Sequence, residues 1–484
     1  MTDAGLPMSL REPPGAEPTR RLGFETIPPW LIVLAAVGCA VLFGRLLADG
    51  RMKYGIALVL VVCFAPLVFF DLSRALAVWV AIVFFKDLSV LSSGPNGIGV
   101  LVGLGWIGTF LGRRGPMLLI REHRRLLLVI TAFALWLTLS IAWAANAGAA
   151  GNEAAFWWLG ALTFLVVLTT LTSPRDVGIL ALAFVAGSVV SVIIGLATGS
   201  INSAANTATA TASATQTAVG GRFIGGGGDP NVQAAAFVAA LFLITGLFSV
   251  YRGRKARAAL LASFVLIAVG FFATQSRGGL LALAVATIAA LVLAPRQRGR
   301  ILGLAALVVI AGGILLAAKP GALARITDLG GGSSGRSDLW RVGWQVFTGH
   351  PIVGVGAGNF EVVESHYVLR PGAISRIQYL TDVPHLVHNT YLQLLAETGV
   401  IGLVGFLAVI IGSLRAAQLA ARRFEALGRV EYADLTRAVM MGTIGMLAAL
   451  FFITNGIDQR LWVLLALGPV LLGIGCRASR SQPG

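Results

Sequence analysis

The chain has 484 residues, of which 57% are hydrophobic and only 12% are charged, and its mean hydropathy is +0.84. Soluble proteins average about 25% charged residues, so this composition excludes an ordinary soluble domain and indicates a multi-pass membrane protein. The formal net charge of +16 would suggest nucleic-acid binding in a soluble chain, but cytoplasmic loops of membrane proteins are also basic. The three cysteines lie in or beside apolar stretches and show neither disulfide nor zinc spacing.

Residues 1–29 are polar and proline-rich, and we expect a short disordered tail without a cleavable signal peptide. Apolar stretches of about 17–25 residues, long enough to cross a bilayer, then recur along the chain. Twelve spans is the main alternative to fourteen, because Arg74 and Lys86 crowd the third stretch and the fourth is short and glycine-rich. The fourteen stretches cover residues 30–47, 54–70, 72–90, 97–112, 126–145, 155–172, 177–198, 231–250, 257–274, 278–294, 301–318, 399–414, 436–455 and 460–476.

This pattern predicts an all-α polytopic fold of about 12–14 transmembrane helices with one long, partly helical extracytoplasmic loop. We divide the chain into five parts: a cytoplasmic tail (1–29), N-terminal transmembrane helices (30–198), central helices with two arginine motifs (199–318), the long loop (319–398), and C-terminal helices with a short tail (399–484).

The basic residues mostly obey the positive-inside rule if both termini are cytoplasmic. Four clusters, at 113–125, 252–257, 296–300 and 415–429, then fall on the cytoplasmic side. The region 45–53 is an exception, because its three basic residues fall outside. The basic balance is therefore mainly a topology signal, and we expect no nucleic-acid partner.

Two short outer connections each contain a single arginine. The first begins with a Ser/Thr/Ala-rich run at 199–219 and continues with Arg222 among glycines, which allow close approach of the backbone to a ligand. Asp229 and Pro230 then predict a helix start. The second is a tight hairpin that places Arg277 at the outer surface. Arginine suits bidentate phosphate recognition, although solvated or snorkelling arginines are an equally weighted structural explanation.

The long loop shows a helix-forming segment and then a glycine-rich connection. A helix capped by Ser337 or Asp338 would place Trp340 and Trp344 on one face, which suits the membrane interface. The connection at 349–360 is rich in turn residues.

Two histidines follow this loop. Pro384 and Gly399 are suited to the start and end of a helix, on which His385 and His388 would share a face. His388 is suited to act as a general base, with His385, Glu397 or an outer carboxylate orienting it. A metal site is a weaker alternative, because no third ligand is close in sequence. The ionisable residues of this sequence lie at or near the ends of the predicted spans. Ion-coupled transporters usually place such residues in the middle of their spans, so this placement argues against that class.

Three blocks of the sequence resemble the O-antigen ligase and polymerase superfamily of bacterial envelope enzymes, whose relatives include O-linking oligosaccharyltransferases. The likeness covers about residues 220–415. The blocks are Gly221-Arg222-Phe with Asp229-Pro230-Asn231; Ser276-Arg277-Gly278-Gly279; and Gly335-Arg336 through Trp340, Gly354 and Phe360 to His388-Asn389, Glu397 and Gly399.

The resemblance implies a lipid-dependent membrane glycosyltransferase of the bacterial inner membrane, with its active site on the extracytoplasmic face. Its donor would be an undecaprenyl-pyrophosphate-linked glycan, with no cofactor and no metal. By the resemblance, Arg222 and Arg277 match the pyrophosphate-binding arginines and His388 matches the essential loop histidine. The candidate supporting residues are His385, Asn389, Glu397, Arg336, Asp458 and Arg460.

The resemblance leaves open whether the chain is a ligase or a polymerase, and whether the acceptor is a glycan, a lipid or a protein. The insert at 203–219 and two extra N-terminal spans depart from the family's pattern. A transporter or flippase for an envelope lipid is the alternative from another class, and a non-enzymatic scaffold is a third.

Overall fold

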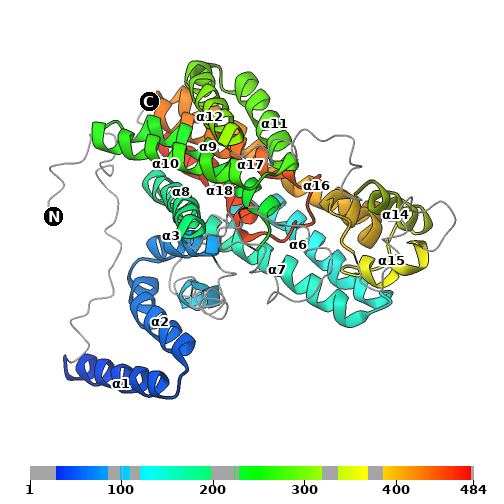
Figure 1. Ribbon diagram of the computed structural model, residues 1–484, viewed down its shortest axis with the longest axis horizontal. Helices are drawn as coiled ribbons and strands as arrows, with labels where there is room; N and C mark the ends of the chain where they lie inside the picture. Colours follow the sequence, from blue (N-terminus) through cyan, green and yellow to red (C-terminus); the bar gives the residue numbers. More distant parts are fainter. Residues whose placement is uncertain are drawn as a thin grey trace.

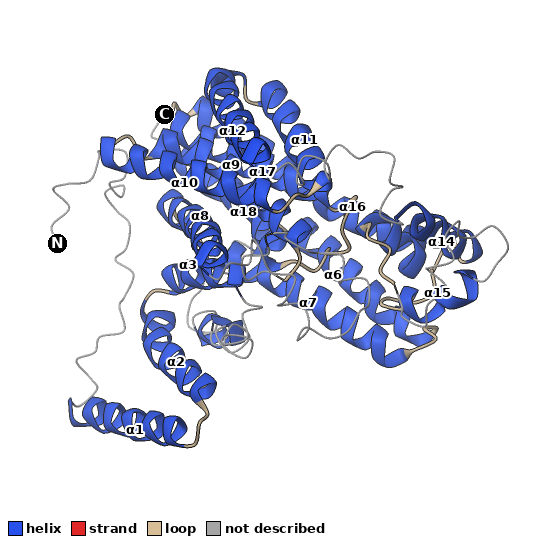
Figure 2. Ribbon diagram, viewed as in Figure 1, coloured by secondary structure: helices blue, strands red, loops and turns tan. Residues whose placement is uncertain are grey.

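A computed structural model describes residues 29–85, 99–100, 102–108, 120–197, 223, 228–318, 336–368 and 385–480, and within these ranges the chain is helical with no strand (Figure 2). The α-helices labelled in Figure 1 are α1 (Pro29–Ala48), α2 (Met52–Phe70), α3 (Leu72–Ile82), α6 (Arg124–Leu139), α7 (Ala147–Thr170), α8 (Pro174–Ala197), α9 (Pro230–Val250), α10 (Arg254–Ala273), α11 (Arg277–Leu293), α12 (Arg298–Ala318), α14 (Arg336–Gly349), α15 (Phe360–Val368), α16 (Thr390–Ala426), α17 (Val430–Ala449) and α18 (Gln459–Arg480). The described residues also include three short 3-10 helices, η4 (Val83–Phe85), η5 (Ser140–Ala142) and η8 (Pro295–Gln297).

Eight helical segments in the described part of the chain are long and apolar enough to cross a membrane, so the prediction of an all-helical multi-pass membrane protein is confirmed. Each corresponds to one of the predicted spans. They are Arg124–Ala142, Ala147–Thr170, Pro174–Ala197, Pro230–Val250, Arg254–Ala273, Pro295–Ile314, Thr390–Ala426 and Gln459–Arg480.

The remaining six predicted spans are not among these eight segments, and the total of 12–14 stays a prediction. Five of them fall on α1, α2, α3, α11 and α17, while the stretch at 97–112 lies partly outside the described residues. Helix α11 has 17 residues. Helix α17 carries Glu431, Asp434 and Arg437 near its start, which lower its mean hydropathy.

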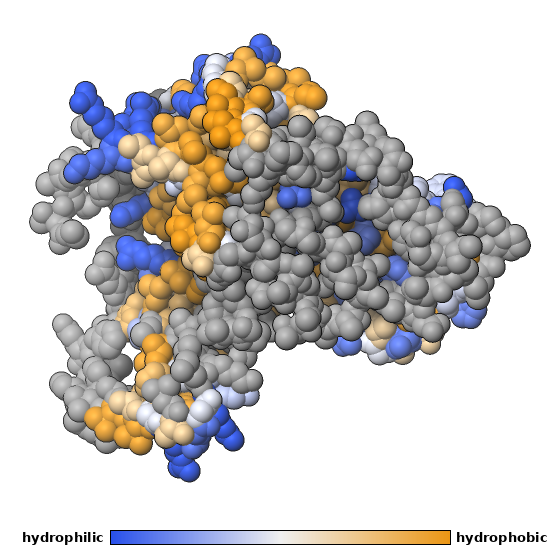
Figure 3. Space-filling model, in the orientation of Figure 1, coloured by the Kyte–Doolittle hydropathy of each residue, from blue (hydrophilic) through white to orange (hydrophobic). Residues whose placement is uncertain are grey.

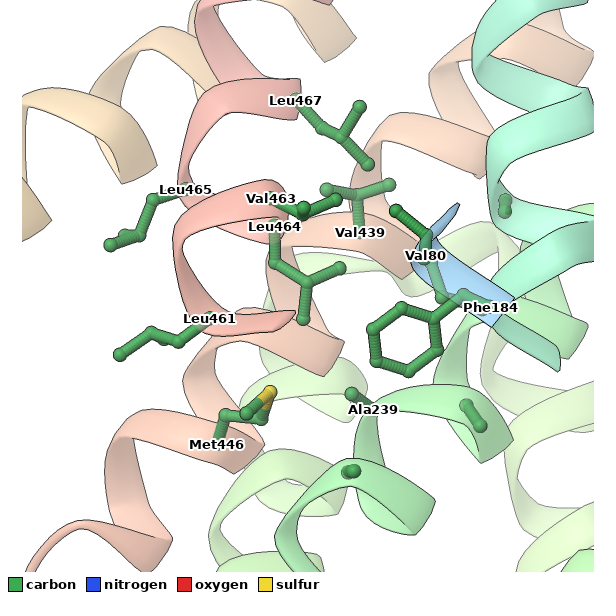
Figure 4. Packing of buried hydrophobic residues seen from close by; sticks show 14 of the residues in the cluster. Val80, Phe184, Ala239, Val439, Met446, Leu461, Val463, Leu464, Leu465 and Leu467 are labelled. Atoms are coloured by element: carbon green, nitrogen blue, oxygen red, sulfur yellow. The ribbon is translucent and has the colours of Figure 1, made fainter. Parts of the chain in front are cut away.

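The centre of the bundle is the seam between α9 and α17, and α18 lies beside it. Small residues line this seam: a Cβ atom on Gly246 would come within 2.6 Å of the Ala438 Cβ, and one on Gly445 within 2.5 Å of Val238. Such residues let two backbones approach closely, which is how helices pack where apolar burial gives no preference over lipid. Figure 4 shows how α3, α8, α9, α17 and α18 pack their apolar side chains together.

The two ends of the bundle differ. Helices α14 and α15 lie at one end, together with the starts of α9, α11, α16 and α18, and we name this the loop end (Figure 1). The opposite end is joined by polar contacts: Arg300 donates to the Thr245 carbonyl and the Ser249 hydroxyl, both at 2.8 Å. Figure 3 shows apolar side chains over α10, α11 and α12, with hydrophilic residues where α10 begins.

The long loop is fixed to the bundle by a joint at Gly399. Helix α16 is interrupted there, with φ 67° and ψ −169°. The connection between α14 and α15 lies against this interruption, because the Gly356 N–H donates to the Glu397 carbonyl at 2.8 Å and the Val400 N–H donates to the Pro351 carbonyl at 3.0 Å. The indole N–H of Trp136, on α6, donates to the Thr398 carbonyl at 3.0 Å.

Two predicted helix starts are wrong. The helix expected from Pro384 begins instead at Thr390, because the Asn389 side chain accepts from the N–H groups at the first turn and ends the preceding extended segment. His385 and His388 therefore precede the helix and do not share one of its faces. Helix α14 begins at Arg336, so Ser337 and Asp338 lie inside its first turn and neither caps it.

Replacing Gly399 by alanine should destabilise the protein by about 3 kcal/mol, since its backbone conformation is almost confined to glycine and a Cβ would collide with the Ile352 carbonyl. Thermal unfolding in detergent should show a clearly lower midpoint. Gly303→Ala is the matched control, because a Cβ there meets nothing within 4 Å. Equal midpoints for the two variants would contradict this role of the joint.

Candidate active site

A hydrogen bond joins the first turns of α9 and α11. Asp229 caps α9 by accepting from the N–H groups of Asn231 at 2.6 Å and Val232 at 3.4 Å, as the Asp-Pro sequence predicts. The Ser276 hydroxyl caps α11 by accepting from the Gly279 N–H at 3.1 Å, and it donates to Asn231 Oδ1 at 2.8 Å. Two of the three sequence blocks therefore meet, although these two residues are 45 positions apart.

Arg277 is the first residue of α11, and its side chain is exposed at the loop end. The start of a helix presents unpaired backbone N–H groups and the positive end of the helix dipole, so the guanidinium adds to a place that already favours an anion. Arg222 lies outside the described residues. Its neighbour Phe223 is buried, and the Phe223 N–H donates to the Ala273 carbonyl at 3.1 Å, close to the turn before α11.

His388 lies between α15 and α16 in a left-handed backbone conformation, with φ 53°. Few residues other than glycine adopt this conformation without strain. Asn389 follows as the cap of α16, and Thr390 is anchored to the turn after α17 by its hydroxyl, which donates to the Ile453 carbonyl at 2.7 Å. The imidazole is thus held at the start of α16, next to the beginning of a candidate membrane span.

The charges around His388 come from the other sequence blocks. Burial has the largest effect and lowers the pKa of the imidazole below its ordinary value. The positive charge of Arg336, and that of His385 when it is protonated, lower the pKa further, whereas the negative charge of Asp229 raises it. Arg336 at the start of α14 and Asp229 at the start of α9 therefore act on one imidazole. At neutral pH this imidazole is uncharged and able to accept a proton.

His385 is paired with a carboxylate that the sequence did not predict. Glu364 on α15 accepts from the His385 backbone N–H at 2.7 Å, and its other oxygen lies 3.3 Å from Nδ1 of the ring. Both side chains are buried. Burial lowers the pKa of His385 and raises that of Glu364 to about 7. His385 thus holds the segment in place, and the spacing of the two histidines gave no signal for Glu364.

Glu397 belongs to the joint at Gly399 and not to the groups that surround His388. Its buried carboxylate accepts from the Gly358 N–H at 2.9 Å, from the Phe360 N–H at 3.3 Å and from the Gln393 side chain at 3.2 Å. The Glu-Thr-Gly sequence and the glycine-rich connection are therefore two halves of one contact. We assign Glu397 a structural role in holding the loop.

Asp458 and Arg460 form a buried pair behind the site. Arg460 donates to both carboxylate oxygens of Asp458, the shorter bond being 2.7 Å, and to Gln233 on α9 at 3.2 Å. Asp458 also accepts from the Asn455 side chain at 2.9 Å, and the Asn455 N–H donates to the Thr390 hydroxyl at 3.0 Å. This network joins the starts of α9, α16 and α18.

Helix α14 lies over the start of α11. Trp340 packs on Phe452, with ring centroids 6.3 Å apart, and a Cβ on Gly278 would come within 2.7 Å of the Phe452 Cβ. Trp344 is exposed and packs beside Phe347. Of the two tryptophans predicted to face a membrane interface together, only Trp344 is exposed.

The three sequence blocks thus converge at the loop end, and a comparison with protein families covers two of them. The sequence model of the family described as O-antigen ligase matches residues 262–407. Residues 262–407 form an O-antigen ligase family domain. A search of curated proteins finds no match to the chain.

The O-antigen ligase domain contains Arg277, Arg336, His385, His388 and Glu397, together with α14 and α15. The Arg222 and Asp229 block precedes the matched range, and Asp458 and Arg460 follow it. The predicted resemblance is confirmed over the matched residues. The family indicates glycan transfer of the ligase or polymerase type, with lipid-linked glycans as substrates in general.

Within the described residues, no three His, Cys, Asp or Glu side chains gather as a set of metal ligands. The expectation of a metal-independent and cofactor-free reaction stays a prediction.

The acid limb of the pH profile of kcat/KM should respond to the charges around His388. Arg336→Gln removes a positive charge that lowers its pKa, so the limb should move to higher pH. Asp229→Asn removes the charge that raises it, so the limb should move to lower pH, and asparagine still caps α9. Glycan transfer measured across pH 5–9 tests both shifts.

Arg341→Gln is the control for these pH profiles. Arg341 is exposed on α14, which also carries Arg336, and it is not among the groups that shift the pKa of His388. Shifts of the same direction in the Arg336 and Asp229 variants would contradict the assignment.

Proposed function

We propose that the chain transfers a glycan from an undecaprenyl-pyrophosphate-linked donor to an acceptor hydroxyl, with inversion at the anomeric carbon. The supporting observation is the convergence of the starts of α9, α11 and α14 with His388 at one end of a membrane bundle. An exposed guanidinium and a neutral imidazole then lie at the end of apolar helices. This combination suits a substrate with an anionic head and a lipid tail.

Each group has a part in the proposed reaction. Arg277, with Arg222, binds the donor pyrophosphate, while the isoprenoid tail lies against the apolar helices. His388 accepts the proton of the acceptor hydroxyl as its oxygen bonds to the anomeric carbon. The bond from that carbon to the phosphate oxygen breaks, and undecaprenyl pyrophosphate leaves with the electron pair. The arginines stabilise the charge that develops on this leaving group.

We infer that the loop end faces the extracytoplasmic side of a bacterial inner membrane. The connection between α9 and α10 and the one between α11 and α12 lie at the opposite end and carry the basic clusters at 252–257 and 296–300. Short basic loops remain cytoplasmic. This orientation also places the C-terminal end of α18 in the cytoplasm, and we expect the N-terminus there too.

Replacing His388 by alanine should lower kcat for glycan transfer by roughly 100- to 10,000-fold, the usual contribution of a general base. Arg222→Ala and Arg277→Ala should lower transfer by at least about 100-fold, because the leaving pyrophosphate loses charge stabilisation. Purified enzyme, a defined lipid-linked glycan and mass spectrometry of the products measure these rates.

Two matched variants control for surface and folding effects. His350→Ala removes an exposed histidine, and Arg254→Ala removes an exposed arginine at the opposite end. Both should transfer glycan at the wild-type rate. Near-normal transfer by the His388 and both arginine variants would refute the site.

The product distinguishes the remaining alternatives. A ligase moves one glycan chain to a different acceptor, whereas a polymerase builds a ladder of repeat units on the same lipid. A flippase would move the lipid-linked glycan across vesicles without forming a glycosidic bond. Transport without any new bond would refute the proposed enzyme activity.

A further inference from the structure

The strained backbone of His388 has an anchor on each side. A non-glycine residue with positive φ persists only where its surroundings fix it. On the C-terminal side, Asn389 caps α16, and the Thr390 N–H donates to the carbonyls of Leu450 and Ile453 at 2.9 and 3.0 Å. These bonds fix the residue after His388 but leave the direction of the preceding chain open.

The N-terminal anchor is Glu364. One carboxylate oxygen accepts from the His385 N–H at 2.7 Å and the other lies 3.3 Å from the ring Nδ1, so backbone and ring are held at once. Glu364 is 4% exposed and His385 is 6% exposed. Between His385 and His388, Val387 packs in an apolar cluster with Tyr367 and Val368 of α15. Helix α15 therefore holds this segment in two ways, by the contacts of Glu364 with His385 and by the apolar cluster that includes Val387.

We propose that Glu364 is a positioning residue for glycan transfer, which holds the His385–His388 segment so that the His388 imidazole reaches the acceptor hydroxyl. The inference rests on the proposed role of His388. Both carboxylate oxygens of Glu364 lie against His385, so we do not assign it a role as a second base. It acts on the reaction indirectly, by fixing the backbone that carries His388.

The protonation of Glu364 decides which tautomer of His385 it holds. The ionised carboxylate accepts from an Nδ1–H, whereas the protonated carboxyl donates to Nδ1 and leaves the ring proton on Nε2. The charged groups around the segment are His385 and Glu361 at Glu364, and Arg336, Asp229 and His385 at His388. Burial, aided by the negative charge of Glu361, raises the pKa of Glu364 to about 7. Both the ionised and the protonated form of Glu364 therefore occur near neutral pH.

The raised pKa of Glu364 also makes the free energy of unfolding depend on pH. The pKa of Glu364 in the folded protein is above its ordinary value, so the folded state binds more protons than the unfolded chain between these two values. The free energy of unfolding therefore falls as pH rises from the ordinary carboxyl value to about 7. A glutamine, which does not titrate, removes this pH dependence.

Four variants of the full-length enzyme are compared with the wild type. Glu364→Gln keeps the shape and mimics the protonated carboxyl, because its oxygen accepts from the His385 N–H and its amide donates to Nδ1. Glu364→Ala removes both contacts. Glu361→Gln, one turn earlier on α15 and exposed, is the control. His388→Ala is measured in parallel.

We expect Glu364→Ala to lower kcat by about 100-fold, as a misplaced catalytic group does, with an unchanged KM for the donor. Glu364→Gln should match the wild type below pH 7 and should lose the pH dependence that the wild type shows around pH 7. Glu361→Gln should keep the rate below pH 7. It should move this pH dependence to lower pH, because it removes the negative charge that helps to raise the pKa of Glu364.

Several outcomes would overturn the inference. Normal kcat in Glu364→Ala would do so, as would an increase of the donor KM without a loss of kcat. If the alanine variant does not fold, the glutamine variant decides, and a pH profile identical to the wild type at every pH refutes the proposal. Normal transfer by His388→Ala would instead refute the proposed function itself.

Discussion

The site depends on the interruption of α16 at Gly399. A helix that continued without a break would leave no free carbonyls for the connection between α14 and α15. The interruption frees backbone groups of residues 396–400, and these bond with residues 351–356. Buried Glu397 then accepts two further N–H groups of the same connection. The segment that carries α14 and α15 is thereby joined to a candidate membrane helix, and this joint helps to set the positions of α14, α15 and His388.

Burial and nearby positive charge favour the neutral form of the His388 imidazole at the loop end, where Arg277 is exposed. Partial burial is costly for an imidazolium, and the nearby positive groups add to this cost. Arginine keeps its proton under such conditions. A base and an anion-binding group can therefore coexist at the loop end, a pairing that the proposed transfer from a pyrophosphate requires. The buried Asp458–Arg460 pair behind them is neutral overall and fixes three helix starts.

Sequence patterns were sufficient for the class of fold and for local signals. Hydropathy located the eight helices that meet the criteria for a span, and the Asp-Pro sequence located the start of α9. Helix-end propensity failed at His385, because Pro384 and Asn389 both suit a start and only the side-chain bonds of Asn389 decide between them. Glu364 could not be found from the sequence, since its partner lies 21 residues away across the loop. The Asn231–Ser276 contact is equally non-local.

The small-residue seam between α9 and α17 predicts where the sequence tolerates little variation. A larger side chain at Gly246 would meet backbone and Cβ atoms of α17, and one at Gly445 would meet Val238 of α9. In contrast, a Cβ at Gly303 on α12 meets nothing within 4 Å. Saturation mutagenesis should therefore recover few residue types at positions 246 and 445 and many at position 303.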